Sequence, residues 1–84
     1  MFAVFLERRA EKDLDNFPHN IRQLILKEIL SLKDSPWPHG CKKLKGETHN
    51  WRLRVGDYRV LYEIDSASKA IKLYRIKHRR EAYR

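Results

Sequence analysis

The segment WRLRVGDYRVLY, residues 51–62, constrains the fold more than any other stretch of this 84-residue chain. Apolar and charged residues alternate with a period of two on both sides of Gly56-Asp57, which predicts two antiparallel strands joined by a two-residue turn. Glycine in the first turn position favours a type II′ turn, because it adopts positive φ without a Cβ clash. The predicted hairpin sets Val55 opposite Tyr58 and Arg54 opposite Arg59.

The two faces of this hairpin differ in character. One face is apolar and aromatic and predicts a buried surface, made of Trp51, Leu53, Val55, Tyr58, Val60 and Tyr62. The other face carries Arg52, Arg54 and Arg59. Like charges directly opposite each other destabilise a sheet by up to about 1 kcal/mol, so an anionic ligand over this face would explain the arrangement. The alternative is an exposed sheet face whose arginines are solvated, with acidic residues of a neighbouring strand between them.

The net charge of +8 is distributed unevenly along the chain. Residues 1–41 hold six Lys/Arg and six Asp/Glu, whereas residues 42–84 hold thirteen Lys/Arg and five Asp/Glu. A basic half joined to a neutral half indicates a polyanion-binding surface, and nucleic acid is the commonest polyanion. An acidic protein partner is the competing explanation, and the two are compatible if one masks the site for the other.

Several classes of protein are disfavoured by composition. No apolar run approaches the ~20 residues of a membrane span, so no membrane partner is expected. Cys41 is the only cysteine, which excludes an intrachain disulfide and favours the reducing cytoplasm. His39 and Cys41 are too few for a zinc site, and no phosphate-binding loop is present, so neither metal nor cofactor is expected.

The order of the predicted elements is β-α-α-β-β-β. Residues 1–84 are expected to form a single α+β domain in which a helical hairpin packs on an antiparallel four-stranded sheet. Trp37, between two prolines, is expected to plug one end of the core, and stacking on a nucleic-acid base is the alternative. Neither face of the last strand can be assigned to the core from periodicity. The predicted ranges are 2–6 for the first strand, 7–17 and 19–34 for the helices, 51–55, 58–64 and 71–77 for the other strands, and 78–84 for a basic tail.

Three segments resemble the RelE/ParE toxin superfamily: KLKG at 43–46, WRLRVGDYRVLYEI at 51–64 and IKHRREAY at 76–83. The resemblance covers nearly the whole chain and implies the toxin of a type II toxin–antitoxin module. RelE-like members cleave mRNA in the ribosomal decoding site and are silenced by an acidic antitoxin that wraps them. ParE-like members share the fold, inhibit DNA gyrase and lack the RNase residues.

Metal-free RNA cleavage needs cations around the phosphate and groups that move protons. The resemblance matches Arg59 to the family's central phosphate-binding arginine and Tyr83 to its C-terminal tyrosine. Lys77 lies in the late basic cluster, and His78 is the best acid or base on ordinary chemistry because imidazole titrates near neutral pH. Arg59, His78, Tyr83 and Lys77 are therefore the predicted catalytic residues.

Seven other basic residues of the second half are predicted to bind nucleic acid: Arg52, Arg54, Lys43, Lys45, Arg75, Arg79 and Arg80. Arg52 departs from the family pattern, since RelE-like toxins carry a catalytic lysine there and arginine is a poor general base. We expect a ribosome-dependent mRNA endoribonuclease with a cognate acidic antitoxin. The alternatives are a ParE-like gyrase inhibitor and an inactive toxin that only binds its antitoxin.

Overall fold

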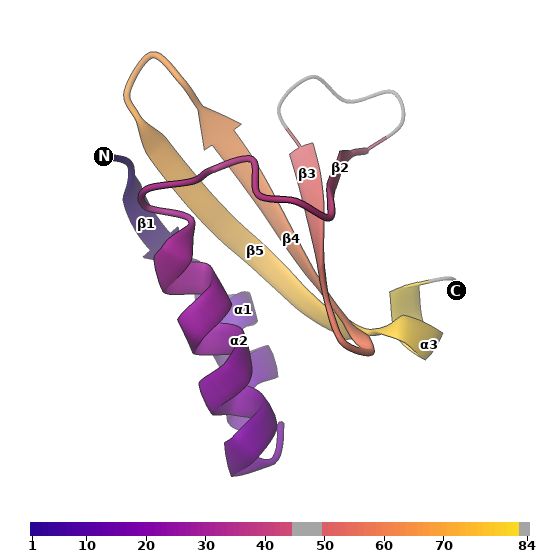
Figure 1. Cartoon of the computed structure of the whole chain (residues 1–84). Helices are drawn as coiled ribbons and strands as arrows, with labels where there is room; N and C mark the ends of the chain where they lie inside the picture. Colours follow the sequence, from indigo (N-terminus) through magenta and orange to yellow (C-terminus); the bar gives the residue numbers. More distant parts are fainter. Residues whose placement is uncertain (45–49, 83–84) are drawn as a thin grey trace.

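The computed structural model describes residues 1–44 and 50–82 as two helices packed on a five-stranded sheet, followed by a short third helix (Figure 1). The strands follow the order β1-β5-β4-β3-β2 across the sheet. The predicted α+β class is confirmed, but the sheet has five strands rather than four. In chain order the elements are β1 Ala3–Leu6, α1 Arg8–Asp15, α2 His19–Ser31, β2 Cys41–Lys43, β3 Asn50–Val55, β4 Tyr58–Asp65, β5 Ala70–His78 and α3 Arg79–Ala82.

The helices are shorter than the sequence pattern predicts. The helix expected over 7–17 spans Arg8–Asp15, and the one expected over 19–34 spans His19–Ser31. Pro18 is the residue before α2, in an extended conformation with φ −56° and ψ 150°. None of the helices in residues 1–44 and 50–82 is long and apolar enough to cross a membrane.

The central hairpin forms as predicted. β3 and β4 pair antiparallel with Val55 opposite Tyr58 and Arg54 opposite Arg59. Gly56 has φ +58°, while Asp57 is not among the residues with positive φ. This combination is the one expected of a type II′ turn, in which only the first central residue needs the left-handed region.

The additional strand, β2, lies at the sheet edge beside β3. Its three residues, Cys41–Lys43, pair antiparallel with Leu53, Arg52 and Trp51. A short basic segment has no apolar periodicity, so the pairing with β3, rather than a local pattern, makes it a strand. At the opposite edge β1 runs parallel to β5, which corrects the expectation of a wholly antiparallel sheet.

The core lies between the helices and one face of the sheet. Tyr62 is completely buried there, and its hydroxyl donates a hydrogen bond of 3.1 Å to the carbonyl oxygen of Pro36. Trp37 does not plug the core, because 47% of it is exposed and its ring meets the edges of Phe2 and Trp51. The other large side chains that are fully buried are Ile25, Ile29, Leu32, Ile71, Leu73, Ile76 and Val60.

An irregularity in β5 decides which of its side chains face the core. Tyr62 of β4 pairs with Leu73, but the next residue, Leu61, pairs with Arg75. Tyr74 is thus the extra residue of a β-bulge, and the alternation of β5 shifts by one beyond it. This shift allows Ile71, Leu73 and Ile76 all to be buried.

Candidate functional site

The sheet face opposite the helices carries two adjacent rows of basic side chains. In the first row Arg54 of β3 lies opposite Arg59 of β4, which lies opposite Lys77 of β5. The second row contains Lys42, Arg52, Leu61 and Arg75 in order across four strands. Since cross-strand neighbours with like charge repel each other, this face is electrostatically suited to an anion.

Arg59 lies at the centre of the first row and is nearly buried, with 5% of its surface exposed. Its Nη1 donates a long hydrogen bond of 3.3 Å to the carbonyl oxygen of Tyr58. No carboxylate of residues 1–44 or 50–80 forms an ion pair with it. Within the same residues every fully buried side-chain nitrogen or oxygen has a partner, so the guanidinium N–H groups without a partner retain contact with solvent.

A hollow on this face gathers the basic groups of three strands. The described residues that line it include no carboxylate and are Gly40, Lys42, Arg52, Arg54, Gly56 and Arg59. Arg54 folds over the turn, where its Nε donates to the carbonyl oxygen of Gly56 at 3.4 Å. A planar guanidinium binds two oxygens of one phosphate, so the hollow has the geometry and charge to hold a phosphodiester.

Lys42 belongs to this hollow although it was not among the predicted site residues. The sequence offered one signal, the run of lysines at 42, 43 and 45, but β2 was needed to distinguish them. Lys42 pairs with Arg52, whereas Lys43 pairs with Trp51 and therefore belongs to the other face of the sheet. Lys45 lies outside the described residues.

His78 is not brought together with Arg59. It pairs with Tyr58 at the end of β5, so alternation places the two residues on the face opposite that of Arg59 and Lys77. The rings of His78 and Tyr58 meet edge to face with centroids 5.2 Å apart, and Phe17 packs on Tyr58 at 4.8 Å. The His78 Nδ1 accepts a hydrogen bond of 3.2 Å from the backbone N–H of Arg80, as the N-cap residue of a helix does.

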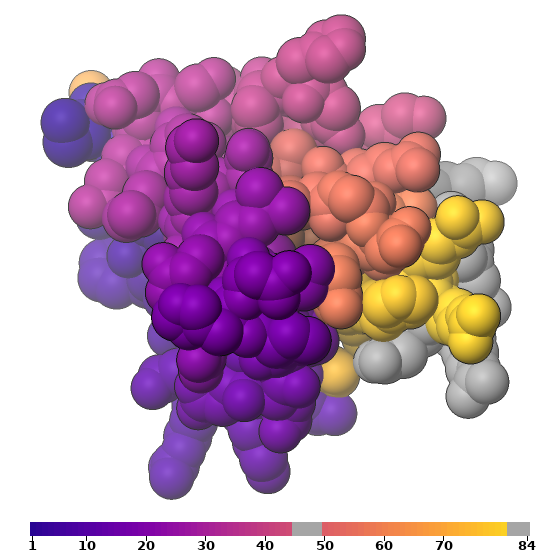
Figure 2. Space-filling view, turned by 60° about the horizontal axis from the view of Figure 1, so that its bottom comes forward, coloured from indigo at the N-terminus to yellow at the C-terminus, as the bar shows by residue number. Residues whose placement is uncertain are grey.

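The helix α3 lies beside the turn of the central hairpin (Figure 1). The backbone N–H of Arg79 donates to the carbonyl oxygen of Asp57 at 2.6 Å, which fastens α3 to the turn. Figure 2 shows the hairpin and the yellow C-terminal segment in contact at one end of the molecule. Arg79 and Arg80 are exposed there and line a hollow with Asp57 and His78. Tyr83, the remaining predicted catalytic residue, lies outside the described residues.

Arg75 has a partner that the first row lacks. Its Nε donates to Oδ2 of Asp13 at 2.9 Å, and its Nη2 approaches Oδ1 at 3.5 Å. The guanidinium is therefore directed to α1 rather than to the hollow around Arg59. Among the residues that the structure describes, no three His, Cys, Asp or Glu side chains gather as metal ligands.

Comparisons with known proteins identify the family. The family model described as the ParE toxin of type II toxin–antitoxin systems, parDE, matches residues 4–83. The protein named "Putative toxin RelE1" of Methanocaldococcus jannaschii is 31% identical over 86 residues, which cover 99% of this chain and 96% of that protein.

Solved structures agree with this assignment. In the crystal structure of the toxin–antitoxin complex RelBE2 from Mycobacterium tuberculosis, the matching chain is 28% identical with a TM-score of 0.83, covering 93% of this chain and 98% of that chain. The matching chain of the archaeal RelE–RelB complex from Pyrococcus horikoshii is 29% identical with a TM-score of 0.83, covering 93% and 94%. The chain therefore belongs to the RelE/ParE superfamily, in the family of ParE toxins of type II toxin–antitoxin systems.

Proposed function

We propose that this toxin is a ribosome-dependent mRNA endoribonuclease that works without a metal ion. The observation that carries the proposal is the row Arg54–Arg59–Lys77, with a nearly buried arginine at its centre that has no carboxylate partner among the described residues. A row of like charges costs stability in the free protein, so its presence is explained by an anion that it binds.

The reaction is an attack by the 2′-hydroxyl of a nucleotide on its own 3′-phosphate. The 2′ oxygen forms a bond to phosphorus, the bond from phosphorus to the 5′ oxygen breaks, and a cyclic phosphate and a 5′-hydroxyl result. One proton leaves the 2′-hydroxyl and one is delivered to the departing 5′ oxygen. Negative charge accumulates on the phosphorane, where fixed cations stabilise it more than they stabilise the ground-state diester.

The residues of the first row divide this work. Arg59 holds the non-bridging phosphate oxygens, and Arg54 and Lys77 flank it from the neighbouring strands. Arg52 in the second row contributes charge but is too basic to accept the proton of the 2′-hydroxyl. The main contribution of this face is thus electrostatic.

His78 and Tyr83 complete the proposed catalytic set at the C-terminal end. Because Nδ1 of His78 already accepts the N–H of Arg80, this histidine caps the first turn of α3, which the Arg79 N–H attaches to the carbonyl oxygen of Asp57. We assign it a positioning role through α3, with Tyr83 following directly after that helix in the sequence. Arg79 and Arg80 supply further phosphate contacts beside the turn.

The proposed partner in the resting state is an acidic antitoxin. The RelE–RelB structures from Pyrococcus horikoshii and Methanococcus jannaschii are complexes of toxin with antitoxin, which supports a similar partner for this chain. The net charge of +8 fits an acidic segment that covers the basic rows. Co-expression with a neighbouring acidic antitoxin is expected to restore growth of cells that produce the toxin.

Inhibition of DNA gyrase is the second candidate function. Two observations favour it: the matching family model is that of the ParE toxins, and Arg52 occupies the position where a catalytic lysine was expected. In that case the basic rows would form a docking surface and no phosphodiester would be cleaved by the toxin itself.

Controlled expression in a growing bacterium, with mapping of RNA ends, tests the proposal. The wild type should produce new ends within translated codons, and Arg59→Met should abolish them. Lys27→Met, which removes an exposed charge from α2, is the matched control and should cleave like the wild type. Intact mRNA with a DNA-damage response would establish the gyrase function instead, and absence of both effects would indicate an inactive toxin.

A further inference from the structure

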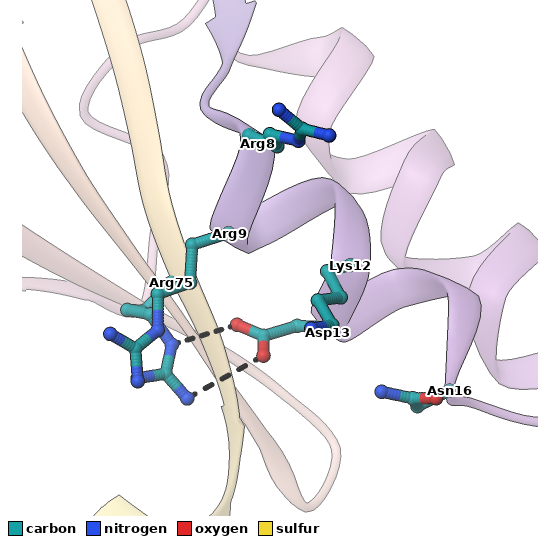
Figure 3. A pocket seen from close by; sticks show the side chains of 6 residues that line it. All are labelled: Arg8, Arg9, Lys12, Asp13, Asn16 and Arg75. Carbon is teal, nitrogen blue, oxygen red and sulfur yellow. Dashed lines mark hydrogen bonds and ion pairs between the residues drawn. The ribbon is translucent and has the colours of Figure 1, made fainter.

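A second basic hollow lies beside α1 (Figure 3), and the described residues that line it are different from those around Arg59. Its lining residues are Arg8, Arg9, Lys12, Asp13, Asn16 and Arg75. We propose that this hollow binds backbone phosphates of a structured nucleic acid and holds it while the sheet face engages the scissile phosphate. The choice of ribosomal RNA as that nucleic acid rests on the proposed function.

Asp13 shapes this hollow because it accepts hydrogen bonds from β5 beyond the point where the pairing with β1 ends. The pairing of β1 with β5 ends at Leu6 opposite Leu73. Beyond that point, Oδ2 of Asp13 accepts the backbone N–H of Ile76 at 2.9 Å and the Nε of Arg75 at 2.9 Å. Both side chains are partly buried, with 22% of Arg75 and 17% of Asp13 exposed. The guanidinium is therefore held in one orientation before any ligand arrives.

The same contacts remove most of the repulsion that Asp13 would exert on an anion. Its two oxygens already accept three N–H groups, so its charge is balanced within the protein. Arg75 uses only Nε and Nη2 for this pair, and its other N–H donors remain for a phosphate. An arginine fixed by a carboxylate on one side is a pre-organised phosphate ligand on the other.

The remaining cations come from successive turns of α1. Arg8 and Lys12 are four residues apart and so lie on one side of the helix, as do Arg9 and Asp13. Figure 3 shows the Arg9 side chain extending toward Arg75, while Arg8 points away to the other end of the hollow. Neither residue, nor Lys12, forms an ion pair with any carboxylate in the described part of the chain.

The second hollow is continuous with the basic rows through β5. Arg75 and Lys77 are two residues apart on that strand, beyond the bulge, and share the open face of the sheet. Two residues along a strand span about 6.6 Å, so Arg75 and Lys77 are direct neighbours on this face. A polyanion longer than one phosphate can therefore contact both.

The composition of the hollow favours nucleic acid over an acidic protein segment. Every described residue that lines the hollow has a charged or polar side chain. Protein interfaces gain most of their affinity from an apolar or aromatic centre that excludes water, and none of these six side chains is aromatic or aliphatic. Phosphate contacts need only cations and N–H donors, which this hollow supplies.

The test compares two double substitutions that remove the same charge. Arg9→Gln with Lys12→Gln changes the hollow, whereas Lys27→Gln with Lys33→Gln changes α2 and the segment after it. Binding of each full-length toxin to small ribosomal subunits, and to a short RNA duplex, is measured over a range of salt concentrations. Thermal melts confirm that each variant is folded, and Arg8→Gln with Lys12→Gln replaces the first variant if it is not.

The variant of the hollow should bind about tenfold more weakly and lose about one unit of salt slope for each phosphate contact removed. Its cleavage should show a raised KM with an unchanged kcat, because these residues position the polyanion and do not touch the reacting phosphate. A salt slope equal to that of the control would overturn the inference. So would weakened antitoxin binding with unchanged RNA binding, which would make the hollow a protein-docking site.

The outcome separates this inference from the proposed function. Loss of salt slope in a toxin whose wild type never cleaves RNA would support the phosphate site and refute the nuclease. Cleavage by the wild type, together with the same salt slope in the hollow variant and the control variant, would support the nuclease and refute the phosphate site.

Discussion

Replacing Arg59 with methionine should leave the free toxin as stable as the wild type or more stable. The side chain lies between two cations, Arg54 on one neighbouring strand and Lys77 on the other. A like-charge pair directly across strands costs up to about 1 kcal/mol, so relief of both repulsions contributes at most about 2 kcal/mol.

The substitution removes little that stabilises the folded state. Within the described residues Arg59 donates one hydrogen bond, a long one of 3.3 Å to the carbonyl oxygen of Tyr58, whose loss costs about 1 kcal/mol or less. An unbranched methionine keeps most of the packing of the arginine stem. The free energy of unfolding should therefore rise by about 0–1 kcal/mol, which for a domain of this size raises Tm by up to about 4–8 °C.

Salt provides the decisive arm of the experiment. The Debye length falls from about 10 Å at 0.1 M salt to about 3 Å at 1 M, which screens the repulsion in the wild type. The difference in Tm between Arg59→Met and the wild type should therefore be largest at low salt and become smaller at 1 M, where screening of these partly buried charges is incomplete and the loss of the Tyr58 hydrogen bond remains.

Arg75→Met is the matched control, because it removes the same group from a satisfied position. This change leaves Asp13 with the N–H of Ile76 alone and should lower the free energy of unfolding by about 1–3 kcal/mol. The reasoning is refuted if Arg59→Met melts several degrees below the wild type at low salt and the deficit persists at 1 M. Arg59 would then be a stabilising residue and not one held against repulsion for a ligand.

Three further changes test the turn, the core and the C-terminal helix. Gly56→Ala should lower the free energy of unfolding by about 1–2 kcal/mol, measured by urea titration, because φ of +58° is strained for alanine. Tyr62→Phe should cost about 1–2 kcal/mol through the unpaired Pro36 carbonyl. Burial, and then the nearby Cys41, raises the pKa of Tyr62, so the folded state keeps a proton that the unfolded state releases. Melts of the wild type should accordingly show stability falling above about pH 10, a loss that Tyr62→Phe lacks. His78→Asn should keep the amide-exchange protection of Arg80 and most of the RNA cleavage, because asparagine caps helices well, whereas His78→Ala should lose both. If His78→Asn keeps the protection of Arg80 but does not cleave RNA, His78 transfers a proton in the reaction.

The hairpin could be predicted because its information is local. Alternation with a period of two and a Gly-Asp turn fix the register within twelve residues, and the structure has the predicted pairs. β2 could not be predicted in this way, because its three residues become a strand only through pairing with β3. The parallel pairing of β1 with β5 likewise joins segments more than sixty residues apart, which no local pattern records.

The candidate site was predictable only as far as the hairpin reaches. Arg52, Arg54 and Arg59 share a face by alternation alone, and the structure keeps them together. Lys42 lines the hollow because β2 pairs with β3, and Arg75 is held by Asp13 because α1 packs against β5. Both depend on contacts between elements. These contacts separate basic residues that look equivalent in the sequence.

The bulge at Tyr74 determines which residue of β5 stands beside Arg59. If β5 were a regular strand with Ile71 and Leu73 in the core, alternation would also turn Arg75 and Lys77 toward the core and His78 toward the open face. Burying an isoleucine contributes about 1.5–3 kcal/mol to the stability of the fold, whereas burying an unpaired cation is costly. A bulge of one extra residue, which returns Ile76 to the core, is therefore favoured. The bulge thereby exchanges the faces of Lys77 and His78, and the first row receives a lysine instead of a histidine. The requirement to bury Ile71, Leu73 and Ile76 together is thus what sets the chemistry of the basic face.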